Sequence, residues 1–304
     1  MGSLLRGTAL LAIVGGGLAW FLTSPDSLNA ARFEGLTGDP IHGALVFAIA
    51  GCASCHTAPD SVPAAQPVLS GGRSFASAFG TFIAPNISPD PAAGIGGWTD
   101  GDILTAVMRG VDPDGAHIFP ALPFDAYGRA TPQDMLDLVS YLRTLPADAT
   151  PSQPHQIGFP FNIRRAVGGW KLLFRRDGWT LQGELTDQQG RGRYLVEALA
   201  HCGECHTPRN ILGGLRRDQW LSGAPNPSGE GRIPNITPGA LQWSEGQIAA
   251  YLKSGFTPDF DTAGGEMAEV IRNTARLTDA DRAAIASYLK AVPAVVSAPT
   301  ASGG

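Results

Sequence analysis

Apolar residues recur at helical spacing at corresponding places in the two halves of the chain, whereas strand-like alternation of apolar and polar residues is weak throughout. A short amphipathic helix is expected at 43–51 and another at 192–201, and each runs directly into a pair of cysteines. A long loop rich in Gly and Pro follows in both halves, and a second helix is expected after Trp98 and after Trp243. The pattern therefore predicts short helices separated by long loops.

Each half closes with a third helix, which Thr131 begins in the first half and Thr278 in the second. Thr suits this position because its hydroxyl oxygen can accept a hydrogen bond from a free N–H group of the first turn. The apolar positions of the two closing helices are Leu136, Leu138, Val139 and Leu142, and Ile285, Ala286 and Leu289. Together these elements predict an all-α fold.

The N-terminal segment 7–23 carries no charge over 17 residues, which is the lower limit of the roughly 17–25 that a membrane-spanning helix needs. Trp20 and Phe21 stand where an aromatic anchor at the membrane interface would lie. A cleaved signal peptide is the alternative, but no A-x-A cleavage site follows. We therefore expect a transmembrane helix within 1–24 of a single-pass bacterial inner-membrane protein, with Arg6 on the cytoplasmic side and the remainder in the periplasm.

Composition and charge narrow the classes of function. The 304 residues include 27 acidic and 22 basic side chains, a net charge of −5 without runs of like charge, which argues against a nucleic-acid-binding protein. Gly and Pro are frequent, at 39 and 24 residues, but an apolar content of 43% excludes a disordered chain. The length suits two domains and a remainder.

The motif C-x-x-C-H occurs twice, at Cys52, Cys55 and His56 and again at Cys202, Cys205 and His206. Two thiols one helical turn apart can each add to a vinyl group of haem, and the adjacent His can then reach the iron, so this motif is the attachment signature of c-type haem. The two motifs use all four cysteines of the chain. The sequence therefore predicts two covalently bound haem c groups.

Other uses of the cysteine pairs fit less well. A zinc ribbon needs its two pairs about 15–20 residues apart, whereas 146 residues separate Cys55 from Cys202. A thioredoxin-like redox pair needs a βαβ setting, but the flanking segments here indicate helices. A disulfide within each pair would leave the following His unexplained in both motifs.

The two halves of the chain are copies of one domain. Residues 98–114 align without gaps to 243–259, the motif PNISP at 85–89 returns as PNITP at 234–238, and both C-x-x-C-H motifs keep an offset of 150. We therefore expect haem domains at 36–147 and 185–294, joined by a linker at 148–184 and followed by a disordered tail at 295–304.

The order of helix, C-x-x-C-H motif, loops, Met-bearing segment and closing helix resembles class I cytochrome c. More narrowly, the chain is similar to the membrane-anchored dihaem cytochrome c subunits of periplasmic dehydrogenases of the alcohol and aldehyde type. The segments that carry this similarity are GTFIAPNISPDPAAGIGGW (80–98), HIFPALPFDAY (117–127), FPFNIRRAVGGWKLLF (159–174) and GGEMAEVIRNTARLTDADRAAIASYL (264–289). The resemblance implies two tandem class I cytochrome c domains after the N-terminal helix.

The resemblance also implies the sixth ligand of the second haem iron. Met267 lies on the loop expected before the final helix, where class I cytochromes place their axial Met. Together with His206 it would give a site of relatively high reduction potential. The alternative is that Met267 only fills a gap in the core.

The first copy departs from this arrangement. The equivalent of Met267 falls in Pro-Ala-Leu at 120–122, where related chains often have Met. His117 lies nearby, and it either binds the iron or makes hydrogen bonds within its loop. We therefore expect the first haem either to be held by His56 and His117 or to lack a strong sixth ligand from the protein.

Asn86 and Trp98 sit in the same loop as each other, and Asn235 and Trp243 sit in the matching loop of the second copy. The resemblance implies that these side chains line the edge of the haem. Ordinary turn chemistry for the Asn residues and core packing for the Trp residues are the alternatives.

The linker carries basic and aromatic side chains that are unusual for an acidic protein, namely Arg164, Arg165, Lys171, Arg175, Arg176, Phe159, Phe161, Trp170, Phe174 and Trp179. Four roles are open for this segment: binding a membrane surface, docking a partner, neutralising haem propionates, or serving as a solvated connector.

A haem iron capped by His and Met has no open coordination site, so such a centre moves single electrons. We expect an electron-transfer subunit, not an enzyme on its own, that takes electrons from a periplasmic dehydrogenase and passes them to quinone, a soluble cytochrome or a terminal oxidase. One alternative is a dihaem enzyme such as a peroxidase that uses an open first haem. Another is the dihaem subunit of a cbb-type oxidase, whose domains are usually shorter.

Overall fold

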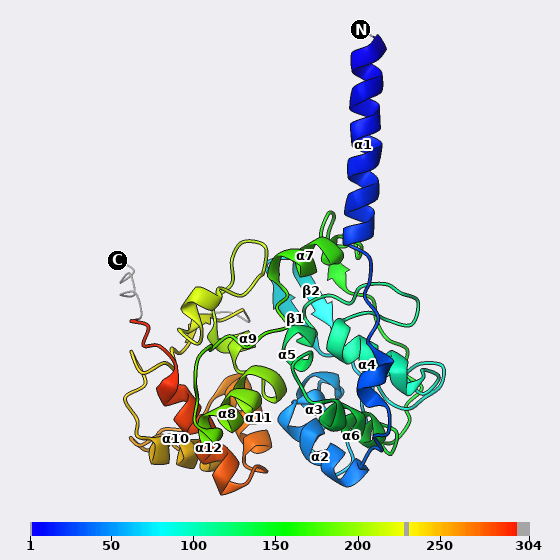
Figure 1. Cartoon of the computed structure of the whole chain (residues 1–304). Coiled ribbons are helices and arrows are strands. Elements are labelled where there is room, and N and C mark those ends of the chain that lie inside the picture. Colours follow the sequence, from blue (N-terminus) through cyan, green and yellow to red (C-terminus); the bar gives the residue numbers. More distant parts are fainter. Residues whose placement is uncertain (1, 228–230, 297–304) are drawn as a thin grey trace.

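The computed structural model describes residues 2–227 and 231–296, so residues 297–304 of the expected tail lie outside the described residues. Two helical copies lie side by side, and a long N-terminal helix projects from the body (Figure 1). The first copy contains α2 (Pro40–Ile49), α3 (Cys52–His56), α4 (Asp100–Arg109), α5 (Phe124–Tyr127) and α6 (Pro132–Leu142), preceded by α1 (Gly2–Leu22) and the 3-10 helix η1 (Ala30–Phe33).

The second copy repeats this order. It contains α8 (Asp187–Tyr194), the π-helix η2 (Leu195–Leu199), α9 (Gly203–His206), the 3-10 helix η3 (Arg217–Gln219), α10 (Glu245–Ser254), α11 (Gly265–Thr274) and α12 (Asp279–Ala291), and α7 (Ala166–Phe174) lies between the copies.

Short strands depart from the all-α expectation, although the structure is rich in helices. β1 (Ser74–Ser77) and β2 (Gly80–Ile83) form an antiparallel hairpin, and β3 (Gln156–Ile157) pairs with β2. In the second copy β4 (Ala224–Pro225) pairs with β5 (Arg232–Ile233). Because each strand has only two to four residues, none is long enough for the alternation that identifies a strand in a sequence.

The caps confirm where the predicted helices begin. The hydroxyl oxygens of Thr131 and Thr278 each accept the N–H group three residues later, at 3.1 and 3.0 Å. The helices expected after the tryptophans begin after Thr99 and Ser244, each of which forms a reciprocal capping box. The helix expected at 43–51 starts earlier, at Pro40, because the carboxylate of the residue before it accepts an N–H group of the first turn.

The first and last helices of each copy cross at a glycine. A Cβ atom on Gly43 of α2 would lie 2.0 Å from the carbonyl oxygen of Asp137 in α6, and a Cβ atom on Gly192 of α8 would lie 2.0 Å from that of Ala284 in α12. Real Cβ atoms do not approach this closely. The two backbones can therefore touch in each copy only because a glycine stands at the crossing.

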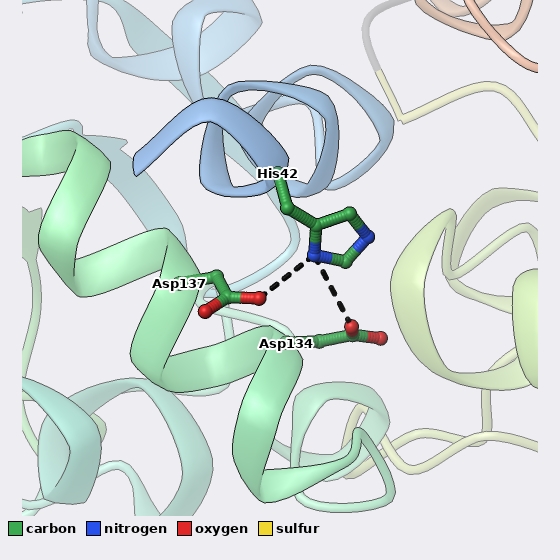
Figure 2. A group of neighbouring side chains, drawn as sticks. All are labelled: His42, Asp134 and Asp137. Carbon is green, nitrogen blue, oxygen red and sulfur yellow. Dashed lines mark hydrogen bonds and ion pairs between the residues drawn. The ribbon is translucent and has the colours of Figure 1, made fainter. Parts of the chain in front are cut away.

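A hydrogen-bonded cluster fastens this crossing in the first copy (Figure 2). His42 Nδ1 lies 2.8 Å from Asp137 Oδ2 and 3.7 Å from Asp134 Oδ1. Asp137 also accepts the N–H group of Asp39 and the amide of Gln133, both at 2.7 Å. Burial raises the pKa of Asp137, but these hydrogen bonds outweigh it and hold the pKa below its ordinary value.

One hydrophobic cluster runs through both copies. It includes Val46 and Leu138 from the first copy and Leu195 and Ile285 from the second, all almost fully buried. Helix α11 of the second copy also contacts α2 of the first. The copies are therefore packed against each other rather than joined only by their linker.

Helix α1 corrects one expectation. Among the described residues, no helix is both long and apolar enough to cross a bilayer. The prediction of a single-pass inner-membrane protein with a transmembrane helix within 1–24 is therefore wrong. The uncharged run has only 17 residues, and four of them, Gly7, Gly15, Gly16 and Gly17, add little apolar surface.

The substitution Gly43→Ala should destabilise the folded protein by about 1–3 kcal/mol, because the added methyl group overlaps the backbone of α6. Urea unfolding of the haem-loaded chain, followed by circular dichroism, measures this change. Gly190→Ala in α8 is the matched control, since a methyl group added there would meet no atom within 4 Å; it should gain up to about 1 kcal/mol from better helix propensity. Equal losses in both variants would contradict the close crossing.

The substitution Asp137→Asn should cost about 1–3 kcal/mol near neutral pH, because charge-assisted hydrogen bonds are lost. The carboxylate stabilises the fold above the ordinary Asp pKa of 3.8, and this contribution disappears as the pH falls through the lowered pKa. Urea unfolding between about pH 7 and pH 2 should therefore show a shallower loss of stability for the variant than for the natural chain. Asp114→Asn, at an exposed position, is the control and should change the free energy of unfolding at pH 7 by no more than about 0.5 kcal/mol.

Candidate haem sites

Both C-x-x-C-H motifs lie on short helical turns, α3 and the segment that leads into α9. No disulfide joins the cysteines of either pair in the structure. Cys52 and Cys202 are half-buried and pack against the hydrophobic cluster, whereas Cys55 and Cys205 are exposed. Each pair thus presents one thiol at the core and one at the surface, both available for a thioether bond to haem.

The histidines of the two motifs are oriented in the same way. Nδ1 of His56 lies 2.8 Å from the carbonyl oxygen of Pro85, and Nδ1 of His206 lies 2.8 Å from that of Pro234. Because a carbonyl oxygen only accepts, the proton sits on Nδ1 and the lone pair of Nε2 is left for a metal. Burial lowers the pKa of both imidazoles, against the opposing effect of the carbonyl, and favours the neutral form that binds iron. These residues fit a haem iron.

The two PNI[ST]P loops owe their shape to Asn86 and Asn235. The side-chain amide of Asn86 donates to the carbonyl oxygens of Asp148 and Thr150, both at 2.8 Å. The amide of Asn235 donates to the carbonyl oxygen of Val295 at 2.7 Å. Each Asn thus holds in place the preceding proline, whose carbonyl oxygen orients the His of the C-x-x-C-H motif. These contacts are the expected turn chemistry, and the lining of the haem edge by Asn86 and Asn235 stays a prediction.

Trp98 and Trp243 stand directly before the caps of α4 and α10. Both are half-buried and pack against the hydrophobic cluster. The ring of Trp243 lies edge-on to that of Tyr251, with 5.2 Å between centroids. Both tryptophans thus contact the core, and their lining of the haem edge stays a prediction.

Met267 lies in the first turn of helix α11, not on a loop as expected from the sequence. Its side chain is half-buried and packs against the hydrophobic cluster. In the first copy Leu122 stands near the corresponding position, also packed against the cluster. Met108 and Met135 are fully buried within α4 and α6. Met267 is thus the thioether that lies at the border of the core in the second copy.

His117 is buried, and hydrogen bonds engage both of its ring nitrogens. Nε2 lies 3.0 Å from the carbonyl oxygen of Thr23, and Nδ1 lies 3.1 Å from the ammonium group of Lys171, which also donates to the carbonyl oxygens of Arg109 and Gly110. Burial lowers the pKa of Lys171 to about 8. His117 therefore links the end of α1 to α7, and its contacts extend well beyond its own loop.

The linker segment is tied to both copies. Arg164 forms an ion pair with Asp112 of the first copy at 2.9 Å. The indole N–H group of Trp170 donates to the carbonyl oxygen of Leu212 in the second copy at 2.9 Å. Phe159 remains largely exposed. Of the four roles open for this segment, these contacts favour that of a connector.

Two residues with evident structural importance were missed in the sequence. Glu197 is almost fully buried and accepts the hydroxyl of Tyr288 at 2.5 Å and the N–H group of Leu181 at 3.0 Å. No local pattern identifies it. His201 has a backbone φ of 40°, in the left-handed region. The alignment of the two copies could have identified His201, because Gly51 occupies the same position directly before the first motif.

Comparison with known proteins agrees with this geometry. The family model of cytochrome c matches the chain twice, over residues 41–146 and 190–293. The chain is 53% identical over 293 residues to the protein named diheme cytochrome c-type of Cereibacter sphaeroides, covering 96% of this chain and 99% of that protein.

Two further relatives are named as subunits of dehydrogenases. The chain is 41% identical over 254 residues to the fructose dehydrogenase cytochrome subunit of Gluconobacter japonicus and 31% identical over 300 residues to the gluconate 2-dehydrogenase cytochrome c subunit of Pantoea cypripedii. The matches cover 81% and 94% of this chain but only 51% and 65% of those proteins. The chain belongs to the cytochrome c family, and its two tandem domains each carry one covalently bound haem c.

Proposed function

We propose that this chain is the dihaem electron-transfer subunit of a dehydrogenase complex. The observation that carries the proposal is the pair of haem sites, each with a carbonyl-oriented His, built into one continuous core. Bound haem c supplies one-electron transfer. The dehydrogenase cytochrome subunits among the relatives support a dehydrogenase as the electron donor. Quinone, a soluble cytochrome or a terminal oxidase is the class of acceptor that we propose.

The two haem domains proposed here span 36–147 and 185–294, with 148–184 as their connector. Within them, His56 and His206 bind iron through Nε2, because Nδ1 is held by a proline carbonyl. Met267 is the proposed sixth ligand in the second domain. In the first domain Leu122 offers no ligand atom and both nitrogens of His117 are engaged, which supports a first haem without a strong sixth ligand from the protein. Unlike axial ligands give unlike reduction potentials.

A dihaem peroxidase is the second candidate, because an open first haem would be a site for peroxide. Such an enzyme needs a side chain that moves a proton at the open face. His117 was the candidate for that role, and its contacts to Thr23 and Lys171 leave neither nitrogen free. Electron transfer is therefore the better supported function.

The function is tested with a tagged, haem-loaded chain purified together with its associated proteins. Anaerobic addition of fructose, gluconate or ethanol should reduce both haems when the associated dehydrogenase accepts that substrate, at one two-electron substrate for each pair of haems. Absorption spectroscopy measures the reduction. Haems that stay oxidised with an active dehydrogenase present, or steady consumption of hydrogen peroxide by the isolated chain, would contradict the proposal.

The ligand role of Met267 predicts that Met267→Ala abolishes the near-infrared charge-transfer band between thioether and ferric iron and lowers the midpoint potential of one haem. Near-infrared absorption and a redox titration measure the two effects. Met108→Leu, a change of similar volume at a fully buried core position, should keep both the band and the potentials. A band that survives in Met267→Ala would show that another thioether binds the iron.

A further inference from the structure

The two haem-attachment motifs face the same contact between the copies. Helix α11 of the second copy contacts α2, the helix that leads into the first motif. Ser54, inside the first motif, also has its hydroxyl oxygen 3.5 Å from the side-chain amide nitrogen of Asn273 in α11.

His201 bridges this contact from the position directly before Cys202. Its Nε2 atom donates to the carbonyl oxygen of Ala50 at 3.2 Å, and Ala50 lies two residues before Cys52. The hydroxyl of Tyr127 donates to the same oxygen at 2.7 Å. The rings of Tyr127 and His201 meet edge-on, with centroids 5.5 Å apart. One carbonyl beside the first motif is thus held from both copies.

The backbone of His201 indicates that this bridge is its main contribution. Its φ of 40° falls in the left-handed region, and Gly51 occupies the equivalent position with a φ of 66°. Glycine adopts this conformation freely, whereas a side chain makes it strained. A glycine would therefore serve the turn better, and what the imidazole adds is its contact with the other copy.

The helix before His201 is also altered relative to the first copy. Cys202 follows the crossing glycine Gly192 by ten residues, whereas Cys52 follows Gly43 by nine. The N–H group of Ala200 bonds to the carbonyl five residues earlier, so the π-helical turn η2 takes up the extra residue. Such turns are frequent at functional sites.

We propose that His201 is a positioning residue that holds the two haem-attachment motifs at the separation needed for electron exchange between them. This inference rests on the proposed electron-transfer function. The step concerned is the passage of one electron between the two attachment sites, in which one haem is oxidised, the other is reduced, and no bond forms or breaks. His201 takes no part in that step itself; it fixes the distance across which the step occurs.

The test is intramolecular electron exchange in the haem-loaded chain. Pulse radiolysis delivers less than one electron per molecule, and absorption at wavelengths that distinguish the haems follows their equilibration. His201→Gly should slow this equilibration severalfold, because the rate of electron transfer between two separated centres falls steeply as the distance between them grows. His201→Asn, which tolerates the left-handed backbone but lacks the imidazole, should slow it likewise. Absorption spectra and midpoint potentials of both haems should stay unchanged, which a general loss of structure would not allow.

Phe260→Gly is the matched control. Phe260 also has a positive φ, of 63°, but its side chain is 90% exposed. The Phe260→Gly variant relieves the same kind of backbone strain at a place distant from the His201 bridge. It should exchange electrons as fast as the natural chain. Natural-rate exchange in His201→Gly with both haems intact would overturn the role of His201 alone. Absence of exchange in the natural chain would instead overturn the proposed function.

Discussion

The crossing of the first and last helices determines where the rest of each copy lies. At Gly43 and at Gly192 the backbone of one helix touches the backbone of the other, and a single methyl group would separate them. The haem-attachment motif follows the first helix within ten residues, so a shift of that helix would move the thiols and the iron-binding His together. The proline carbonyls that orient His56 and His206 come from a different loop, and they can meet the imidazoles only if the helices hold this register.

The two copies share this frame but differ in the chemistry placed on it. In the first copy His42 of α2 contacts two carboxylates of α6 at the helix crossing. In the second copy Arg191 of α8 forms an ion pair with Asp281 of α12 at 2.7 Å. An imidazole makes the first contact and a guanidinium makes the second. Leu122 stands near the place that Met267 takes in the second copy. The two copies therefore combine a common scaffold with unlike surroundings at their haem sites.

The features that could be predicted from the sequence depend on short local patterns or on the repeat of one domain. The motifs, the duplication and the helix caps at Thr131 and Thr278 each depend on residues a few positions apart, and the structure confirms the caps. What could not be predicted depends on distant contacts. His117 bonds to Thr23 and Lys171, which are 94 and 54 residues away, and no spacing rule connects them. The N-terminal prediction failed for a different reason: the absence of charge was taken as apolarity, although glycines fill part of the run.

The shared core bears on how electrons would move between the sites. Domains joined by a flexible linker exchange electrons only when they meet, so the rate depends on their motion. Here the side chains of both copies form one buried cluster, and the connector bonds to both through Arg164 and Trp170. Close-packed interiors do not deform continuously, so the separation of the two attachment motifs is set when the chain folds. Under the proposed function, electron exchange between the copies would then be governed by this fixed separation and not by motion of one domain relative to the other.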